Sequence, residues 1–319
     1  MIASQGISVV VPVYNGAATL GPLVSRLGTV LAALEMDYEI LLVNDGSWDS
    51  SWSGIVELAE SEVRVRGIDL MRNYGQHNAL LAGIREARYD TTVTLDDDLQ
   101  NPPEEIPLLL ATLQEGYDVV YGTPRRHIQG FWRNLATRLA RLALRVAIGS
   151  NAATHVSAFR AFRTGLRDAF VDFSGPYVSV DVLLSWATTR FGAVTVEHHA
   201  RAAGRSNYSF FTLARHAFNV LTGFSTRPLR FASLIGLLTM LFGVGVLVLV
   251  IIRFFAEGGG VPGFPFLASV IAIFAGAQLL SLGLIGEYLA RVHMRVIERP
   301  TYTVREEVGA LVEVERQTP

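Results

Sequence analysis

The chain contains no cysteine among its 319 residues. That absence excludes a disulfide framework, a thiolate metal site and a cysteine nucleophile. An excess of one charge is also lacking, because 27 Lys and Arg residues face 29 Asp and Glu residues and leave a net charge of −2. The chain as a whole therefore has no electrostatic footprint for nucleic acid, and we expect no nucleic-acid partner. Residues 1–5 lack a basic start followed by an apolar run, so we predict no signal peptide.

Apolar residues are abundant, at half of the chain. Two runs, 231–255 and 266–289, are almost free of charge, and a turn rich in Gly and Pro joins them at 258–265. Each run reaches the ~20 residues that a helix needs to cross a ~30 Å hydrocarbon layer. We therefore predict a hairpin of two transmembrane helices within residues 231–290. A pair of buried core helices in a soluble protein is the alternative.

Basic residues flank this hairpin on its outer ends, whereas the connecting turn carries little charge. They are Arg227 and Arg230 before it, and Arg291, His293, Arg295 and Arg299 after it. The positive-inside rule then places both ends, and the whole N-terminal domain, in the cytoplasm. We expect a multi-pass protein of the cytoplasmic (inner) membrane.

Residues 1–205 alternate short β-branched runs with helical patterns. This alternation predicts βαβ units and a largely parallel, Rossmann-like α/β sheet, in which ligands bind beyond the carboxyl ends of the strands. The predicted strands span 7–13, 38–44, 65–70, 91–96, 117–121 and 194–198, and helical patterns cover 20–34, 55–59 and 79–87.

Two further segments are amphipathic. Residues 127–148 place four arginines among apolar side chains, and residues 208–224 are rich in aromatics. Such helices can lie on an anionic membrane surface or pack on the sheet with their arginines in water, and for the first segment both readings stay open. We favour the membrane surface for the second, because it leads into the first span, and assign 206–230 to juxtamembrane helices. Residues 291–319 form a cytoplasmic tail, which we expect to be loosely attached from Pro300 onward.

Three of the predicted strands end in polar residues or run directly into them, at Asn15, at Asn44 and Asp45, and at residues 96–98. A single Asp after a strand is usually a helix cap, and we assign Asp49 that role. Three consecutive acids are different, because their repulsion is costly unless a cation or a hydrogen-bond network offsets it.

A divalent cation bound to phosphate oxygens supplies that offset. On an extended segment, Asp96 and Asp98 face one side and Gln100 can add a neutral oxygen, while Asp97 points elsewhere, into solvent. Mg²⁺ is commonly held by one or two carboxylates plus substrate phosphates. We predict a Mg²⁺ or Mn²⁺ site that stabilises a departing nucleoside diphosphate.

These motifs resemble the signatures of family 2 glycosyltransferases with the GT-A fold. The Asp-x-Asp followed by Leu-Gln-x-Pro-Pro-Glu is similar to the subgroup whose acceptor is a polyprenyl phosphate. This subgroup includes the dolichol-phosphate mannose synthases, the bacteriophage-type undecaprenyl-phosphate glucosyltransferases and the undecaprenyl-phosphate 4-deoxy-4-formamido-L-arabinose transferases, of which the last resemble the chain most. The resemblance covers almost the whole chain and is carried by residues 9–15, 43–47, 72–77, 95–104, 226–230 and 286–289.

The resemblance implies inverting, metal-dependent transfer of a sugar from a nucleotide diphosphate, with UDP favoured, onto a membrane-bound polyprenyl phosphate. It assigns Asp98 and Gln100 to the metal, with Asp96 in the catalytic site close to the nucleotide. The nucleotide pocket would be lined by Pro12, Tyr14, Asn15, Asp45, Ser47 and Gly75, and the acceptor phosphate would be met by Arg201, Arg205 and Tyr208. Related proteins also suggest a homo-oligomer joined through the hairpins, where Gly276 and Ala277 permit close packing.

The chain departs from the subgroup at two positions. Thr154 stands where many members have an Asp that is proposed as a base, and His155 can substitute because its pKa suits base work near neutrality. A phosphate monoester is already largely a dianion at pH 7, so a base is not required. Asn207 replaces the usual Lys and removes one cation from the acceptor region.

Two other functions are compatible with parts of the pattern. A processive polysaccharide synthase would carry more spans and a Gln-x-x-Arg-Trp motif, whereas residues 129–133 read Gln-Gly-Phe-Trp-Arg, in the wrong order. A non-catalytic membrane scaffold or lipid-flipping partner would have no need to keep Asp96, Asp98 and Gln100 together.

Overall fold

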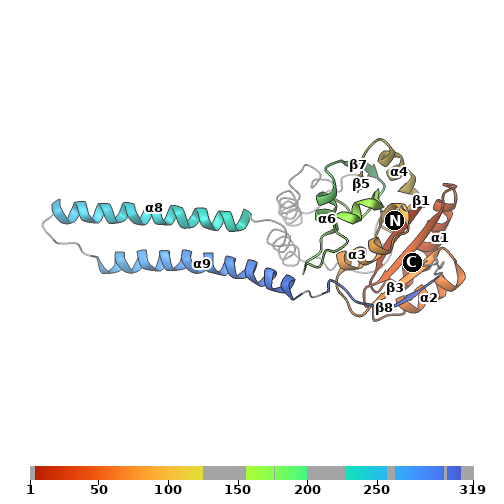
Figure 1. The fold of residues 1–319 in the computed structure, drawn as a ribbon, viewed down its shortest axis with the longest axis horizontal. Helices are drawn as coiled ribbons and strands as arrows, with labels where there is room; N and C mark the ends of the chain where they lie inside the picture. Colours follow the sequence, from red (N-terminus) through yellow and green to blue (C-terminus); the bar gives the residue numbers. More distant parts are fainter. Residues whose placement is uncertain are drawn as a thin grey trace, which may run out of the picture.

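The structure, a computed structural model, describes residues 4–124, 156–175, 177–199, 227–256, 263–297 and 300–309. An α/β domain carries a long two-helix hairpin that projects away from it (Figure 1). This architecture confirms the predicted fold class.

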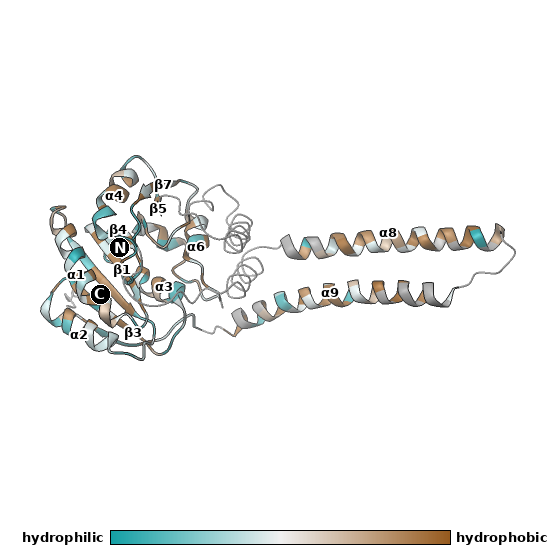
Figure 2. Ribbon diagram, turned by 180° about the vertical axis from the view of Figure 1, so that it is seen from behind, coloured by the Kyte–Doolittle hydropathy of each residue, from teal (hydrophilic) through white to brown (hydrophobic). Residues whose placement is uncertain are grey.

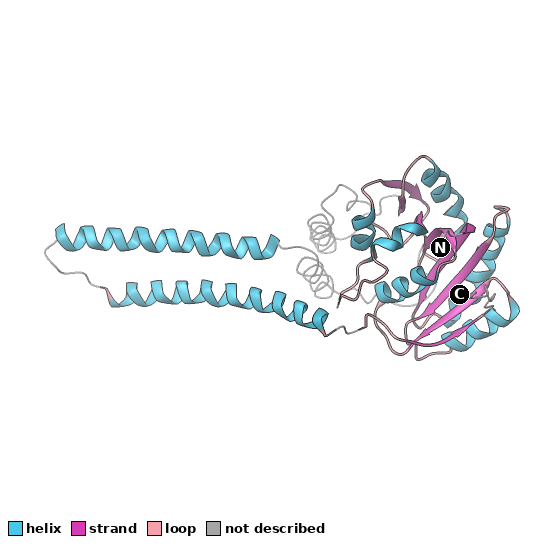
Figure 3. Ribbon diagram, in the orientation of Figure 1, coloured by secondary structure: helices cyan, strands magenta, loops and turns pink. Residues whose placement is uncertain are grey.

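Within the described residues, the domain is built on one mixed sheet of eight strands, ordered β7-β5-β6-β4-β1-β2-β3-β8. Its strands are drawn in magenta in Figure 3. Strands β4, β1, β2 and β3 are neighbours and run parallel to one another, and β5 is parallel to β7. Strands β6 and β8 run antiparallel to the strands beside them. The strands are β1 (Ser4–Val13), β2 (Tyr38–Asn44), β3 (Val65–Leu70), β4 (Tyr89–Thr94), β5 (Val119–Pro124), β6 (Arg160–Arg163), β7 (Phe191–Val196) and β8 (Val304–Val308).

Helices cover both faces of the sheet because the central strands are apolar on both sides. Val9 and Val11 of β1 pack into one core with α1, α2 and α4, and Val10 packs into the other with α3 and α6. This alternation is the period of two expected of a strand. The helices are α1 (Ala17–Ala32), α2 (Ser51–Ser61), α3 (Gln76–Glu86), α4 (Ile106–Gln114) and α6 (Val180–Ala187), with short 3₁₀ helices η1 (Pro103–Glu105) and η3 (Thr164–Ala169).

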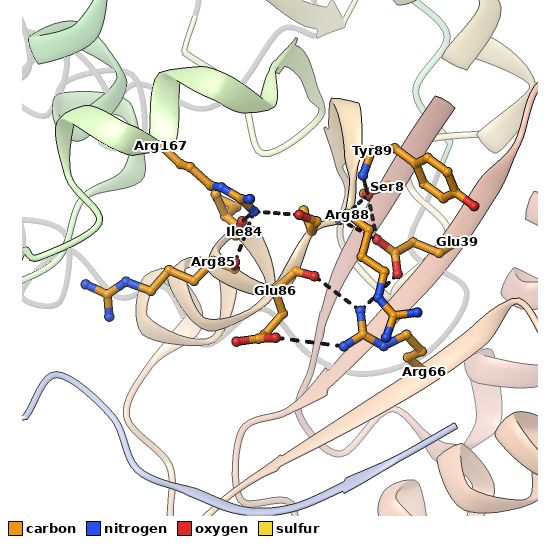
Figure 4. A network of polar contacts seen from close by, with 10 residues as sticks. Ser8, Glu39, Arg66, Ile84, Arg85, Glu86, Arg88, Tyr89 and Arg167 are labelled. Atoms are coloured by element: carbon orange, nitrogen blue, oxygen red, sulfur yellow. Dashed lines mark hydrogen bonds and ion pairs between the residues drawn. The ribbon is translucent and has the colours of Figure 1, made fainter. Parts of the chain in front are cut away.

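A buried polar network closes the amino end of the sheet (Figure 4). The Glu39 carboxylate accepts hydrogen bonds from Ser8 Oγ at 2.7 Å, Arg66 Nη1 at 2.9 Å and the Arg88 N–H at 2.7 Å. Arg167 Nη1 donates to three carbonyls at the end of α3 and so satisfies groups that the helix leaves unpaired. The network lies at the opposite end of the strands from the predicted ligand site.

The hairpin consists of α8 (Arg227–Ala256) and α9 (Phe264–Val296). Both are long and apolar enough to cross a membrane by length and composition, and neither candidate span is buried in the protein. Apolar residues line both helices along most of their length (Figure 2). The alternative of buried core helices does not describe them.

Two expectations need correction. The strand predicted to reach Asp96 ends at Thr94, and a turn follows. The tail was expected to be loose from Pro300 onward, yet residues 304–308 form β8, which pairs antiparallel with β3. The amphipathic segments 127–148 and 208–224 lie outside the described residues.

Candidate active site

The loops after β1 and β2 are joined at the carboxyl edge of the sheet. The Asn15 N–H donates to Ser47 Oγ at 2.9 Å, and the Trp48 N–H donates to Asn15 Oδ1 at 3.1 Å. Asn15 has a φ of 55°, a left-handed conformation that Asn tolerates better than most residues. These reciprocal bonds hold the two loops in one arrangement.

The loop after β3 is fastened to the same edge through Asp45. Its carboxylate accepts the Tyr74 N–H at 2.7 Å and the Gly75 N–H at 2.9 Å. Burial raises the pKa of Asp45 to about 6, although the two amide donors oppose the shift. Gly46 has a φ of 64°, and a Cβ there would overlap the backbone of the β3–α3 loop, so this close approach requires glycine.

The acidic motif after β4 folds as a turn. Asp96 Oδ1 accepts a hydrogen bond from Gln76 Nε2 at 2.6 Å, and Asp98 Oδ1 accepts the Gln100 N–H at 3.1 Å. Leu99 between them has a φ of 59°, so the segment is not extended. Asp96 and Asp98 are both half-buried.

Asp97 does not point into solvent, contrary to the sequence-based prediction. Its carboxylate lies against Gly16, where a Cβ would overlap it, and its buried Oδ2 accepts no hydrogen bond within the described part of the chain. Burial raises the pKa of Asp97 to about 7, with repulsion from Asp96 and Asp98 adding to the shift. The prediction failed because alternation along a strand does not continue through a turn.

The donor set of this loop fits a hard divalent cation, because carboxylate and amide oxygens are the ligands that such ions prefer. Among the residues that the structure describes, no three His, Cys, Asp or Glu side chains are grouped closely enough to hold a metal ion. A cation at Asp96, Asp98 and Gln100 therefore needs further oxygens, which a bound phosphate can supply.

An aromatic pair borders the site. Tyr14 is 40% exposed and Trp48 is 84% exposed, and their ring centroids lie 6.0 Å apart. Pro12, by contrast, is buried within β1 opposite Val43. Sequence reasoning did not single out Trp48, although a large aromatic directly after a Gly-Ser turn was a visible signal.

Two histidines also reach the acidic loop and were missed. The backbone N–H of His199 donates to the Gln100 carbonyl at 2.8 Å, and the ring Nδ1 of His198 lies 3.3 Å from Asn101 Oδ1. Only the His-His pair at the end of a predicted strand hinted at this, because nothing local ties residues about 100 positions apart.

The structure thus brings together Tyr14, Asn15, Asp45, Ser47, Gly75, Asp96, Asp98 and Gln100 at one edge of the sheet. The predicted base His155 and the predicted acceptor residues Arg201, Arg205 and Tyr208 lie outside the described residues, so their roles stay predictions.

Comparison with known proteins shows the family of the chain. Residues 8–170 match the profile described as "Glycosyl transferase family 2". The undecaprenyl-phosphate 4-deoxy-4-formamido-L-arabinose transferase of Proteus mirabilis (strain HI4320) is 38% identical over 95% of this chain and 94% of its own length. The enzyme of the same name from Shewanella sediminis (strain HAW-EB3) is 38% identical over 94% and 92%.

Solved structures share the fold at low sequence identity. Glucosyl-3-phosphoglycerate synthase from Mycobacterium tuberculosis, in complex with Mn²⁺, UDP-glucose and phosphoglyceric acid, has a TM-score of 0.52 and 19% identity and covers 68% of this chain and 78% of its own. A second mycobacterial protein has a TM-score of 0.51 and 20% identity over 68% and 73%. From the profile match and the relatives at 38% identity, the chain belongs to glycosyl transferase family 2.

Proposed function

We propose that the protein transfers a sugar from a UDP-sugar to undecaprenyl phosphate, with inversion, at the cytoplasmic face of the membrane. The observation that carries this proposal is a combination within one chain. An acidic loop whose oxygens suit a divalent cation lies at the carboxyl edge of the sheet, and the same domain bears two exposed apolar helices. The relatives at 38% identity, which cover almost the whole chain, carry names that specify undecaprenyl phosphate.

The donor nucleotide would bind along the carboxyl edge formed by β1, β2 and β3. Asn15, Ser47 and Asp45 offer polar groups that are already held in place, and Tyr14 offers an aromatic face beside them. A binding site whose groups are fixed before binding loses less conformational entropy when the ligand arrives. Since a protein of the same fold was crystallised with UDP-glucose, uridine nucleotides are the first donors to test.

Asp96, Asp98 and Gln100 would hold Mg²⁺ or Mn²⁺ together with the donor diphosphate. A cation bound there supplies positive charge where negative charge develops on the leaving group. The Asp96 carboxylate accepts a hydrogen bond from the Gln76 side chain, and the Asp98 carboxylate accepts one from the backbone N–H of Gln100. Both carboxylates are therefore oriented before any ligand binds.

The acceptor phosphate supplies its own nucleophile. One of its oxygens forms a bond to the anomeric carbon while the bond from that carbon to the diphosphate oxygen breaks, and the nucleoside diphosphate leaves with the electron pair. Attack opposite the leaving group inverts the anomeric centre. The phosphate is largely a dianion at pH 7, so no proton has to be removed. A base at His155 would therefore change the rate of transfer but would not be required for it.

The hairpin and the segments beside it would keep the active site at the depth of the lipid headgroups. Arg201, Arg205 and Tyr208 are the proposed contacts of the acceptor phosphate, because an arginine fork can hold two phosphate oxygens. Gly276 and Ala277 of α9 would let hairpins of neighbouring copies pack closely in a homo-oligomer.

The test is transfer by purified full-length protein in detergent with short-chain polyprenyl phosphate, Mn²⁺ and a panel of radiolabelled nucleotide sugars. We expect a labelled lipid from one donor and a loss of at least about 100-fold in Asp98→Asn, because an electrostatic contact to the leaving group disappears. Asp168→Asn is the control, since Asp168 is exposed in η3, at the far end of the sheet. Activity that survives in Asp98→Asn, or no labelled lipid from any donor, contradicts the proposal.

A further inference from the structure

The buried carboxylate of Asp69, at 1% exposure on β3, depends on a residue from beyond the hairpin. Its Oδ2 accepts Arg305 Nη1 at 3.0 Å, and its Oδ1 accepts Asn44 Nδ2 at 2.6 Å. A buried charge is costly without a partner of opposite charge. Arg305 is the basic residue that the structure pairs with this carboxylate.

From Asp69 the contacts continue into the loops of the proposed donor site. Asn44 Oδ1 accepts the Ser47 N–H at 3.4 Å, and Ser47 Oγ accepts the Asn15 N–H at 2.9 Å. Because Asn44 uses its amide nitrogen on Asp69 and its amide oxygen on Ser47, the position of Asp69 fixes which way the amide points. The series runs from Arg305 to the loop after β1.

Arg305 lies on β8, and the start of this strand also holds the loop after β3 that binds Asp45. Arg305 Nη2 donates to the Met71 carbonyl at 2.8 Å, and the Met71 N–H donates to the Thr303 carbonyl at 2.9 Å. Three residues further on, this loop presents the Tyr74 N–H to Asp45. Residues 303–305 therefore contact both Asp69, from which the contacts lead to Ser47 and Asn15, and the loop after β3, which binds Asp45.

The chain path brings this strand in from the membrane side. β8 begins beside Leu70, the last residue of β3, and it is the C-terminal strand drawn in blue next to β3 in Figure 1. Only residues 297–303 separate the end of α9 from β8. Such a linker spans at most about 29 Å, so α9 ends within reach of the donor edge.

We propose that β8 is a positioning element for the donor site: Arg305, from the segment that follows the hairpin, orders the Asp69–Asn44–Ser47–Asn15 series and the β3–α3 loop. This inference rests on the proposed function. A strand that merely covered the sheet edge would need backbone pairing alone. Here a side chain that is 54% exposed places its charge on a carboxylate that is 1% exposed and leads to the donor loops.

The experiment uses the full-length protein in detergent and compares Arg305→Met with Arg163→Met. Arg163 is the matched control, because its side chain is 56% exposed, lies on the same sheet and faces Asp118 at 3.6 Å, away from the donor edge. Binding of UDP and GDP in the presence of Mn²⁺ is measured by calorimetry. The KM values of the donor and of polyprenyl phosphate are measured in the transfer assay. Hydrogen exchange of the backbone amides of residues 44–48 and 71–75 is measured by mass spectrometry.

We expect Arg305→Met to weaken nucleotide binding and raise the donor KM by about tenfold, with an unchanged acceptor KM and faster exchange in both segments. Arg305→Lys should recover part of the loss, and Asp69→Asn combined with Arg305→Met should recover most of it, because no buried charge is then left unpaired. Arg163→Met should match the wild type.

Three results overturn the inference, and the first is distinguishable from the other two. A wild-type protein that binds neither UDP nor GDP contradicts the proposed donor site, and the inference fails with it. A wild type that binds, with an Arg305→Met variant that binds equally well and exchanges at the same rate, contradicts the positioning role alone. The same conclusion follows if donor and acceptor KM rise equally, since that pattern indicates general damage to the fold.

Discussion

At the scale of single residues, Asp49 and Asp97 show where sequence reasoning succeeds and where it stops. Asp49 was predicted to cap a helix. It lies one residue before Ser50, the N-cap of α2, and its carboxylate accepts the Ser51 N–H of α2 at 3.0 Å and the Ala17 N–H of α1 at 3.3 Å. The bond to Ser51 is local, so spacing in the sequence is enough to predict it, whereas the bond to Ala17 joins residues 32 positions apart and depends on the fold. The inward direction of Asp97 depends on a turn and on its contact with Gly16, neither of which periodicity specifies.

The raised pKa of Asp97 predicts a pH dependence of metal binding. Its carboxyl is half protonated near pH 7, and a cation beside Asp96 and Asp98 would favour the ionised form. Binding then releases a proton, so the affinity for Mn²⁺ with UDP should fall as the pH drops below 7, by up to about tenfold per unit. Calorimetry between pH 8 and 6 should show this slope in the wild type and a flatter slope in Asp97→Asn. Equal slopes would contradict a link through this carboxyl.

Gly46 gives a second prediction at this scale. A Cβ at this position would overlap the backbone at Arg72 and Asn73, and its φ of 64° disfavours any side chain. Gly46→Ala should displace the β3–α3 loop and weaken nucleotide binding by at least about fivefold. Gly165→Ala is the control, because a Cβ there meets nothing within 4 Å. Equal affinities in the two variants would show that the loop tolerates the displacement.

At the scale of elements, apolar runs were enough to predict the four central parallel strands, but two antiparallel strands escaped. β8 reads Val-Arg-Glu-Glu-Val and is mostly exposed at the sheet edge, so its sequence carries the charges that edge strands commonly show and no continuous apolar run. β6 has only four residues, two of them arginines. Each is defined by its partner strand rather than by its own pattern.

The network at the amino end of the sheet should serve stability alone. Arg66→Met leaves the buried Glu39 carboxylate without its charged partner and should lower the unfolding free energy by about 3 kcal/mol. Nucleotide affinity below the melting temperature should not change, because the donor edge lies at the other end of the strands. Arg26→Met removes a more exposed pair with Glu104 and should cost at most about 1 kcal/mol. Thermal melting of both variants checks the contrast, and equal losses would contradict it.

At the scale of the whole molecule, the absence of cysteine makes the membrane topology directly testable. Ala256→Cys places one thiol at the end of α8, and Val63→Cys places one on the exposed surface of the α/β domain. If both ends of the hairpin are cytoplasmic, an impermeant maleimide added to intact cells should label the first and not the second, and lysis should expose both. Labelling of Val63→Cys in intact cells would reverse the proposed orientation.

The central claim is that the chain moves a glycosyl group, and not a sugar phosphate, onto a lipid phosphate. Mass spectrometry of the lipid formed from the active donor tests it most directly. We expect a product with one phosphorus atom, equal in mass to the polyprenyl phosphate plus the sugar less water, together with an equimolar amount of nucleoside diphosphate. A product with two phosphorus atoms and release of a nucleoside monophosphate would contradict it.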